Sequence, residues 1–207
     1  MKSASVTRKA RTRYKADITA GALKLPESRI VADLLIRDLS KVQWKQSIID
    51  DNVLQTQNSA SATRLIRLIR GRLELMENSL WRLVRDGDNV VASHAVFAAA
   101  IKHSKLLGDF LDLIVREQFR VFTPTLSNKQ WDNYLLECRG RDPEMPEWNS
   151  STKNRLRSSV FQMLAQVGYI ESTRTLKLQS VFIAPQVLHY LQEHQEDYVL
   201  RCIQIGV

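Results

Sequence analysis

The sequence predicts an all-α protein, and two observations support this. Apolar residues recur at three- and four-residue spacing along most of the chain, as on the buried face of a helix. Serine, asparagine or proline stands where these stretches begin, and glycine where several end. One short β element is also indicated, because Leu176 and Leu178 alternate with polar residues within 175–183. We expect a compact helical bundle with helix-turn-helix-like elements.

The predicted helices follow one another closely. Pro26 suits the first turn of the first helix, since its missing N–H would have no partner there. Ser40 is expected to cap the second helix, Asn58 or Ser59 the third, and Gly168 to end a long one. The helices are expected at about 25–39, 40–52, 59–76, 77–85, 90–103, 104–119, 127–137, 150–167 and 185–203.

Charge and composition divide the chain into three parts. Residues 1–16 carry six bases and no acid, and they have too few apolar groups to offset the entropy cost of ordering. We expect a disordered basic arm there, an N-terminal helical domain at 17–122, and a C-terminal domain at 123–207. The order helix, glycine, strand-like piece and helix makes the last part winged-helix-like. Residues 139–147, rich in turn-forming and acidic residues, are expected to form a linker or exposed loop.

The net charge of +8 belongs mostly to this arm. Outside residues 1–16 the chain holds 24 bases and 22 acids, so the body is only +2. The arm is either a flexible tether for phosphates or a solubilising tail, and its sequence leaves both interpretations open. The arm bases expected to contact DNA are Arg8, Lys9, Arg11 and Arg13.

The helix expected at 59–76 has an arginine face. At 100° per residue, Arg64, Arg67 and Arg70 fall at about 0°, 300° and 240°, opposite a wide apolar face. Arg72 falls among the apolar positions and is expected to be paired or to snorkel. Guanidinium groups pair bidentately with phosphate oxygens, so the three facing arginines are candidates for nucleic-acid contact. The alternative is a solvated face whose arginines pair with acids elsewhere in the fold.

The preceding helix adds two bases, Lys41 and Lys45, which are expected to brace phosphates if the two helices form a helix-turn-helix. The gap from Asp50 to Asn58 is longer than the usual turn of that motif.

A second basic helix is expected at 150–167, where Lys153, Arg155 and Arg157 occur without a nearby acid. Only Arg155 points clearly away from the apolar face. Arg174 and Lys177 are expected to add to this patch as wing residues. An ordinary helix of the C-terminal core explains the pattern equally well.

Catalytic patterns are absent from the sequence. His189 and His194 are five residues apart and do not match zinc-ligand spacing, and His94 and His103 are expected to be structural. No glycine-rich phosphate loop or nucleophile motif occurs, so we expect no enzyme, no cofactor, no metal and no small-molecule substrate. Cys138 and Cys202 are expected to be reduced thiols of a cytoplasmic protein. No apolar run is long enough to span a membrane.

Several spaced segments resemble the BrxA family of bacteriophage exclusion (BREX) systems. They are residues 19–35, which begin Thr-Ala-Gly-Ala-Leu-Lys-Leu-Pro, then 52–75, 98–119 and 155–170, the last ending Ala-Gln-Val-Gly-Tyr-Ile. The likeness extends over about residues 18–205.

This resemblance implies a small all-helical protein of a phage-defence gene cluster that binds double-stranded DNA and has no catalytic activity. Its partners would include an adenine methyltransferase and ATPases, which would supply the system's chemistry. The residues that match the family's basic helix are Arg64, Arg67 and Arg70. Two other functions stay open: an adaptor whose basic faces bind acidic partner proteins, and an RNA-binding regulator.

Overall fold

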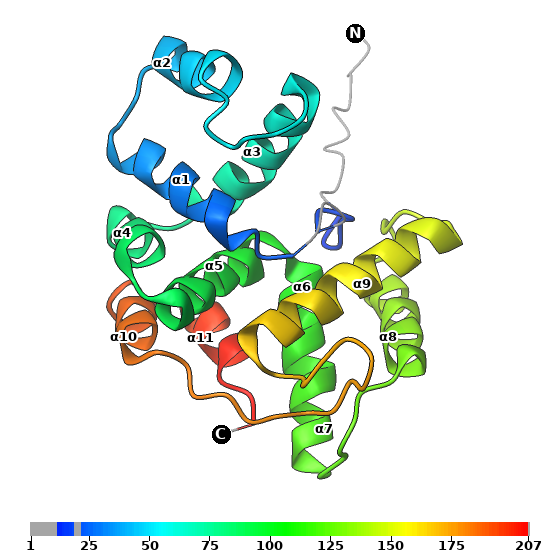
Figure 1. The fold of residues 1–207 in the computed structure, drawn as a ribbon. Helices are drawn as coiled ribbons and strands as arrows, with labels where there is room; N and C mark the ends of the chain where they lie inside the picture. Colours follow the sequence, from blue (N-terminus) through cyan, green and yellow to red (C-terminus); the bar gives the residue numbers. More distant parts are fainter. Residues whose placement is uncertain (1–11, 19–21, 207) are drawn as a thin grey trace, which may run out of the picture.

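The computed structural model describes residues 12–18 and 22–206, and this part of the chain is all-α (Figure 1). The first half forms α1 (Leu25–Ile36), α2 (Lys41–Lys45), the π-helical η1 (Gln46–Asp50), α3 (Ser59–Leu73), α4 (Asn78–Asp86) and α5 (Asn89–His103). The second half forms α6 (Lys105–Asp109), the π-helical η2 (Phe110–Val115), α7 (Arg116–Arg120), α8 (Asn128–Arg141), α9 (Ser150–Val167), α10 (Pro185–Glu193) and α11 (Asp197–Ile203).

The helix boundaries follow local capping chemistry. The Ser40 and Gln43 side chains form a reciprocal capping box at the start of α2. Asn58 Oδ1 accepts a hydrogen bond from the backbone N–H of Ser61 at 2.8 Å and caps α3. Gly168, with φ +96°, ends α9 in the left-handed conformation that glycine adopts without steric cost. These predicted boundaries are confirmed.

Long-range contacts change the helices elsewhere. The helix expected at 185–203 is divided into α10 and α11, and Gln195 at the break has a φ of +53°. The carboxylate of Glu196 pairs with Lys102 on α5, which holds the chain at this break. The helices expected at 40–52 and 104–119 each contain a π-helical segment, and α8 continues to Arg141 into the expected linker.

The expected β element forms isolated bridges rather than a sheet in the described part of the chain. Lys177 pairs with Thr125 and Leu178 with Ile170, both in antiparallel orientation. The extended piece after α9 therefore lies beside the segment that precedes α8.

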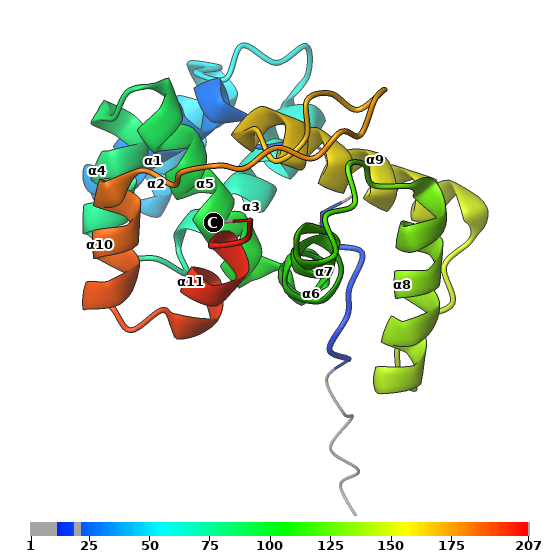
Figure 2. The same cartoon turned by 90° about the horizontal axis from the view of Figure 1, so that it is seen from below.

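Helix α5 lies at the centre of the fold and packs against α1, α3, α4, α6, α9, α10 and α11. Its alanine-rich stretch from Ala95 to Ile101 is fully buried, because small side chains let neighbouring helices approach closely. Seen from below, α10 and α11 lie on one side of α6 and α7, and α8 lies on the other (Figure 2). Described residues before and after residue 122 share one hydrophobic core. The two-domain division at that residue stays a prediction.

Asp109 at the end of α6 is a buried carboxylate with four donors. Tyr14 Oη and Tyr198 Oη donate to it at 2.8 and 2.9 Å. Arg13 Nη2 and Lys105 Nζ lie 2.7 and 3.0 Å from its oxygens. Burial alone would raise the pKa of Asp109, but these hydrogen bonds outweigh burial and lower the pKa.

Gly108 makes room for this arrangement. A Cβ at Gly108 would lie 2.2 Å from Tyr198 Oη, so a side chain there would push the tyrosine away from Asp109. The helix-propensity cost of glycine, about 1 kcal/mol relative to alanine, is thus offset by the approach of α11.

The segment from Thr12 to Ala16 is an ordered part of the fold, so the expected disordered arm is wrong for these residues. Tyr14 is fully buried, and Asp142 Oδ2 accepts hydrogen bonds from Thr12 Oγ1 and from the Arg13 backbone N–H at 2.9 and 2.7 Å. The composition of residues 1–16 does not reveal this order, because the two carboxylates that bind the segment, Asp109 and Asp142, lie about a hundred residues or more away. Residues 1–11, with Arg8, Lys9 and Arg11, lie outside the described residues.

We predict that Asp109→Asn destabilises the fold by about 1–3 kcal/mol, because the buried carboxylate that accepts from Tyr14, Tyr198, Arg13 and Lys105 is then lost. The folded-state pKa of Asp109 is lowered, so its contribution is present above the unfolded pKa of about 4 and is lost as pH falls below it. Urea unfolding between neutral and acidic pH measures both effects. The control, Asp132→Asn, removes an exposed carboxylate and should cost less than about 1 kcal/mol. Equal costs for the two variants would contradict this role of Asp109.

Candidate nucleic-acid interface

Helix α3 buries one face and exposes two arginines on the other. Ile66, Ile69 and Leu73 are buried against the core, whereas Arg64 and Arg67 are exposed. Within the described part of the chain, neither Arg64 nor Arg67 forms an ion pair or a side-chain hydrogen bond. Both guanidinium groups are therefore available to an external anion.

The other two arginines of α3 are engaged within the fold. The Arg70 guanidinium pairs with Glu74 and stacks 4.6 Å from the centre of the Trp44 ring. This contact joins α3 to α2, so Arg70 is largely a structural residue rather than the free phosphate contact that we expected. Arg72 is buried, its Nη1 donates to the Ala22 carbonyl oxygen at 3.1 Å, and burial lowers its pKa to about 10. Of the two expected environments for Arg72, the buried one with a hydrogen-bond partner is found, and the side chain does not extend to solvent.

Helix α2 presents Lys41 and Lys45 to solvent. Lys45 lies at the edge of a groove between η1 and α3, together with Arg67 and Arg70. The connection from η1 to α3 is the loop 51–58, which is braced by hydrogen bonds between Asn52 and Thr56. This loop is longer than the turn of a strict helix-turn-helix. The structure therefore gathers the predicted bases of α2 and α3 at one end of the molecule without that turn.

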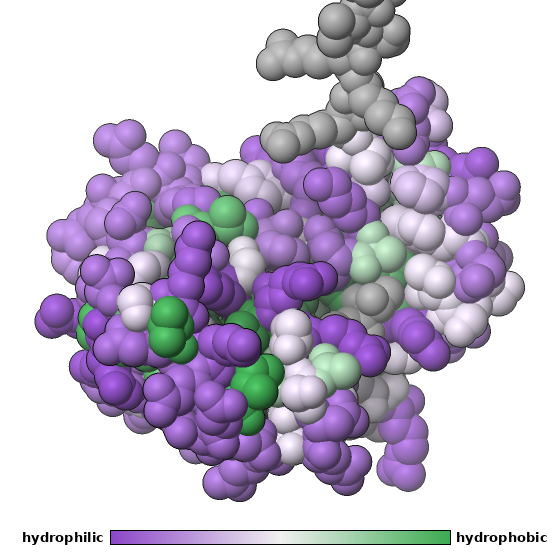
Figure 3. Space-filling model, turned by 90° about the horizontal axis from the view of Figure 1, so that it is seen from above, coloured by the Kyte–Doolittle hydropathy of each residue, from purple (hydrophilic) through white to green (hydrophobic). Residues whose placement is uncertain are grey.

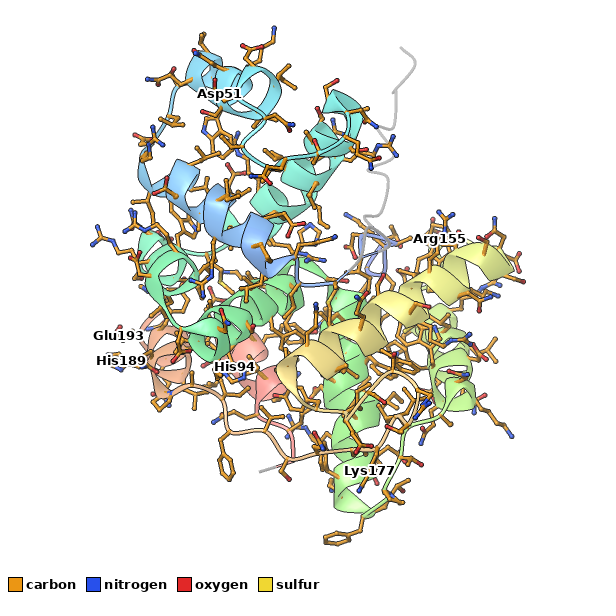
Figure 4. All side chains as sticks on the ribbon, viewed as in Figure 1. Asp51, His94, Arg155, Lys177, His189 and Glu193 are labelled. Atoms are coloured by element: carbon orange, nitrogen blue, oxygen red, sulfur yellow. The ribbon has the colours of Figure 1, made fainter. Side chains whose placement is uncertain are left out.

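The three predicted bases of α9 lie in different surroundings. Arg155 is exposed and lies on the upper side of α9 in Figure 4. Arg157 is directed toward Asp132 on α8, with 3.8 Å between the charged atoms. Lys153 lines a small hollow with Trp148 and Asp132. Among these three bases only Arg155 is free of a nearby acid in the described structure.

The face around Arg155 is polar and has no acid in the described structure. It is lined by Ser151, Asn154, Arg155, Ser158, Ser159 and Gln162. Beyond α9, Arg174 is exposed near the bridged segment that contains Lys177, which Figure 4 places at the lower end of the molecule. The two wing bases lie on the loop that follows α9, and Thr173 of this loop lines a hollow with Arg157 and Ser158 of α9.

Most arginines elsewhere are neutralised by carboxylates. Such pairs are formed by Arg13, Arg37, Arg70, Arg85, Arg116, Arg120, Arg139, Arg141, Arg157 and Arg201. Arg29 and Arg82 donate to Asn89 and Asn78. The exposed arginines of the described chain that lack any such partner are Arg64, Arg67, Arg155 and Arg174. Three of these four lie on the two helices that the sequence singled out.

Two of the histidines, His94 and His189, have local structural partners. His94 Nδ1 accepts a hydrogen bond from the Ala184 backbone N–H at 3.0 Å, and burial lowers the pKa of His94. His189 lies 3.2 Å from Glu193 on α10 (Figure 4). No cluster of three metal-ligating side chains occurs among the described residues. None of the described helices is long and apolar enough to cross a membrane.

Comparison with known proteins agrees with this architecture. The BrxA family model matches residues 12–195. BREX protein BrxA of Paramagnetospirillum magneticum strain AMB-1 is 54% identical over 198 residues, covering 96% of this chain and all of that protein. BREX protein BrxA of Escherichia coli O9:H4 strain HS is 28% identical over 88% of this chain and 86% of its own length.

A solved structure shares the fold. The crystal structure of an uncharacterized protein from Magnetospirillum magneticum superposes with a TM-score of 0.87 at 55% sequence identity, covering 93% of this chain and 98% of that one. With the family match over most of its length, this chain belongs to the BrxA family of BREX phage-defence proteins.

Proposed function

We propose that this BrxA protein is a non-catalytic, cytoplasmic accessory subunit of its BREX system that binds double-stranded DNA through phosphate contacts. The proposal rests on the exposed guanidinium groups of Arg64 and Arg67, which lie on one face of α3 and form no ion pair within the described chain. In a body with nearly equal numbers of acids and bases, free arginines on a shared face favour a polyanionic ligand.

Two further groups of bases support the same ligand. Lys41 and Lys45 on α2 extend the α3 surface, and Arg155 adds a free cation on α9. The ordered segment 12–18 fixes where the basic residues 1–11 join the body, so Asp109 and Asp142 determine the point from which the arm can reach a duplex. We expect α3 to set the docking geometry and the arm to add sequence-independent attraction.

Catalysis is assigned in this proposal to other components, the methyltransferase and ATPases of the system. The protein would bring them to DNA or hold DNA beside them. A structured RNA of equal length, used as competitor against the duplex, distinguishes this role from that of an RNA-binding regulator.

Arg64→Glu combined with Arg67→Glu should weaken duplex binding by more than about tenfold at low salt. It should also reduce the slope of log K against log salt by about 2, because two phosphate contacts are lost. Fluorescence anisotropy with a labelled duplex over a salt series measures both. The matched control is Arg82→Glu with Arg120→Glu, which makes the same charge change on α4 and α7. If the two double variants lose affinity equally, general charge rather than α3 binds the DNA.

Arg70→Gln and Arg64→Gln should separate structure from binding. Arg70 stacks on Trp44, so its replacement should lower the free energy of unfolding by about 1 kcal/mol, whereas Arg64→Gln should change it by less than about 0.5 kcal/mol. Thermal unfolding measures stability, and the anisotropy assay measures affinity. The division of roles is wrong if Arg70→Gln leaves stability intact and weakens binding more than Arg64→Gln does.

A further inference from the structure

The surface between η1 and α3 carries a groove that phosphate binding does not explain. Its volume is about 360 Å³, and it is lined by Lys45, Ile48, Ile49, Thr63, Ile66, Arg67 and Arg70. The lining thus combines three isoleucines with three basic side chains, and no acid occurs among these described lining residues. Figure 3 looks onto this end of the molecule, where green apolar side chains lie among purple polar ones.

The apolar part of the groove is only partly covered by the protein itself. Ile49 is 38% exposed, and Val42 on the adjacent α2 is 77% exposed. The segment that presents Ile48 and Ile49 is π-helical, a rare geometry that is frequent at functional sites. Segment η1 continues directly from α2 and packs on α3. The exposure of Ile49 and Val42 shows that this part of the groove faces solvent rather than the core.

The lining determines what kind of group fits. Phosphates would neutralise the bases at the edges but would gain nothing from three isoleucine side chains. An apolar side chain would bury the exposed parts of Ile48 and Ile49, at roughly 25 cal/mol for each Å² removed from water, and flanking carboxylates would meet Lys45 and Arg67. The complementary ligand therefore carries leucine-like side chains with acids beside them.

The chain's own basic arm is a poor occupant. Residues 1–11 hold Lys2, Arg8, Lys9 and Arg11 and no acid, so the bases of the groove would repel them. The acidic segment 142–147 has its apolar Met145 already buried in the core. Charge and burial thus favour a different protein as the partner.

We propose that the η1–α3 groove docks an acidic amphipathic helix of a partner protein. Leucine-like anchors spaced i and i+4 would lie over Ile48, Ile49 and Ile66, and the glutamates or aspartates of the helix would pair with Lys45 and Arg67. The proposal goes beyond DNA binding and does not depend on it, because it rests on apolar isoleucine side chains that phosphates do not bind. Since Arg67 belongs to both surfaces, the partner helix and a duplex would compete for this end of the protein.

A synthetic peptide tests the proposal on the full-length chain. The probe is a fluorescein-labelled helix of about 18 residues with leucines at i and i+4 among glutamates, and its control has serine in place of each leucine. We expect saturable binding of the leucine peptide and at least tenfold weaker binding of the serine peptide by anisotropy. Equal binding of the two peptides would show a purely electrostatic contact and overturn the proposal.

Substitution of the groove separates the two surfaces. Ile49→Ser should weaken the leucine peptide about tenfold, and duplex DNA affinity should stay within about twofold, since Ile49 carries no charge. If the wild-type chain binds the leucine peptide but not duplex DNA, the proposed DNA function is refuted and this proposal stands. An unchanged peptide affinity in a folded Ile49→Ser variant would refute the groove.

A methyl NMR titration of the wild-type protein needs no variant. Addition of the leucine peptide should shift the δ1-methyl resonances of Ile48, Ile49 and Ile66 and leave Ile183, buried near α10, unchanged. If a DNA duplex shifts these methyl groups and the peptide does not, the groove belongs to the nucleic-acid surface and the proposal fails.

Discussion

A buried carboxylate, Asp109, holds together three parts of the chain that are distant in sequence. Tyr14 and Arg13 come from the N-terminal segment, Lys105 from α6 and Tyr198 from α11. Four donors outweigh the cost of burying one negative charge, so the group stays ionised and its pKa falls. Gly108 beside it carries no side chain, which lets α11 approach. The positions of the N-terminal segment and of the C-terminal helix both depend on this contact.

Ion pairing within the fold also determines which basic side chains remain available to bind a ligand. Carboxylates engage most arginines of the body, Asp112 alone meeting both Arg116 and Arg201. The guanidinium groups without partners in the described chain are concentrated on α3, α9 and the loop after α9. Because the body is almost neutral, this distribution rather than the net charge indicates where a polyanion would bind.

Local chemistry made much of the fold predictable. Ser40, Asn58 and Gly168 act within a few residues of themselves, so their caps and the helices that they bound follow from the sequence. The structural predictions were wrong where a residue far away in the sequence determines the local conformation. Tyr14 is ordered by Asp109 and Asp142, and the break between α10 and α11 lies where Glu196 pairs with Lys102.

For the candidate interface, too, the sequence does not show which side chains are engaged by distant residues. Helical spacing placed Arg64, Arg67 and Arg70 on one face, but spacing does not show that Trp44 and Glu74 engage Arg70. On α9, the nearby Asp132 distinguishes Arg157 from Arg155, and that acid lies on another helix. The groove between η1 and α3 depends on a π-helical turn and has no counterpart in the sequence pattern.

The central claim is that duplex DNA lies against the free arginines of α3. Arginine modification by phenylglyoxal, with and without a saturating duplex, followed by peptide mass spectrometry, tests it residue by residue. We predict that DNA protects Arg64 and Arg67, while exposed Arg82 on α4 reacts at the same rate in both states. Equal protection of Arg82, or unchanged reactivity of Arg64 and Arg67 in the saturated complex, would contradict it.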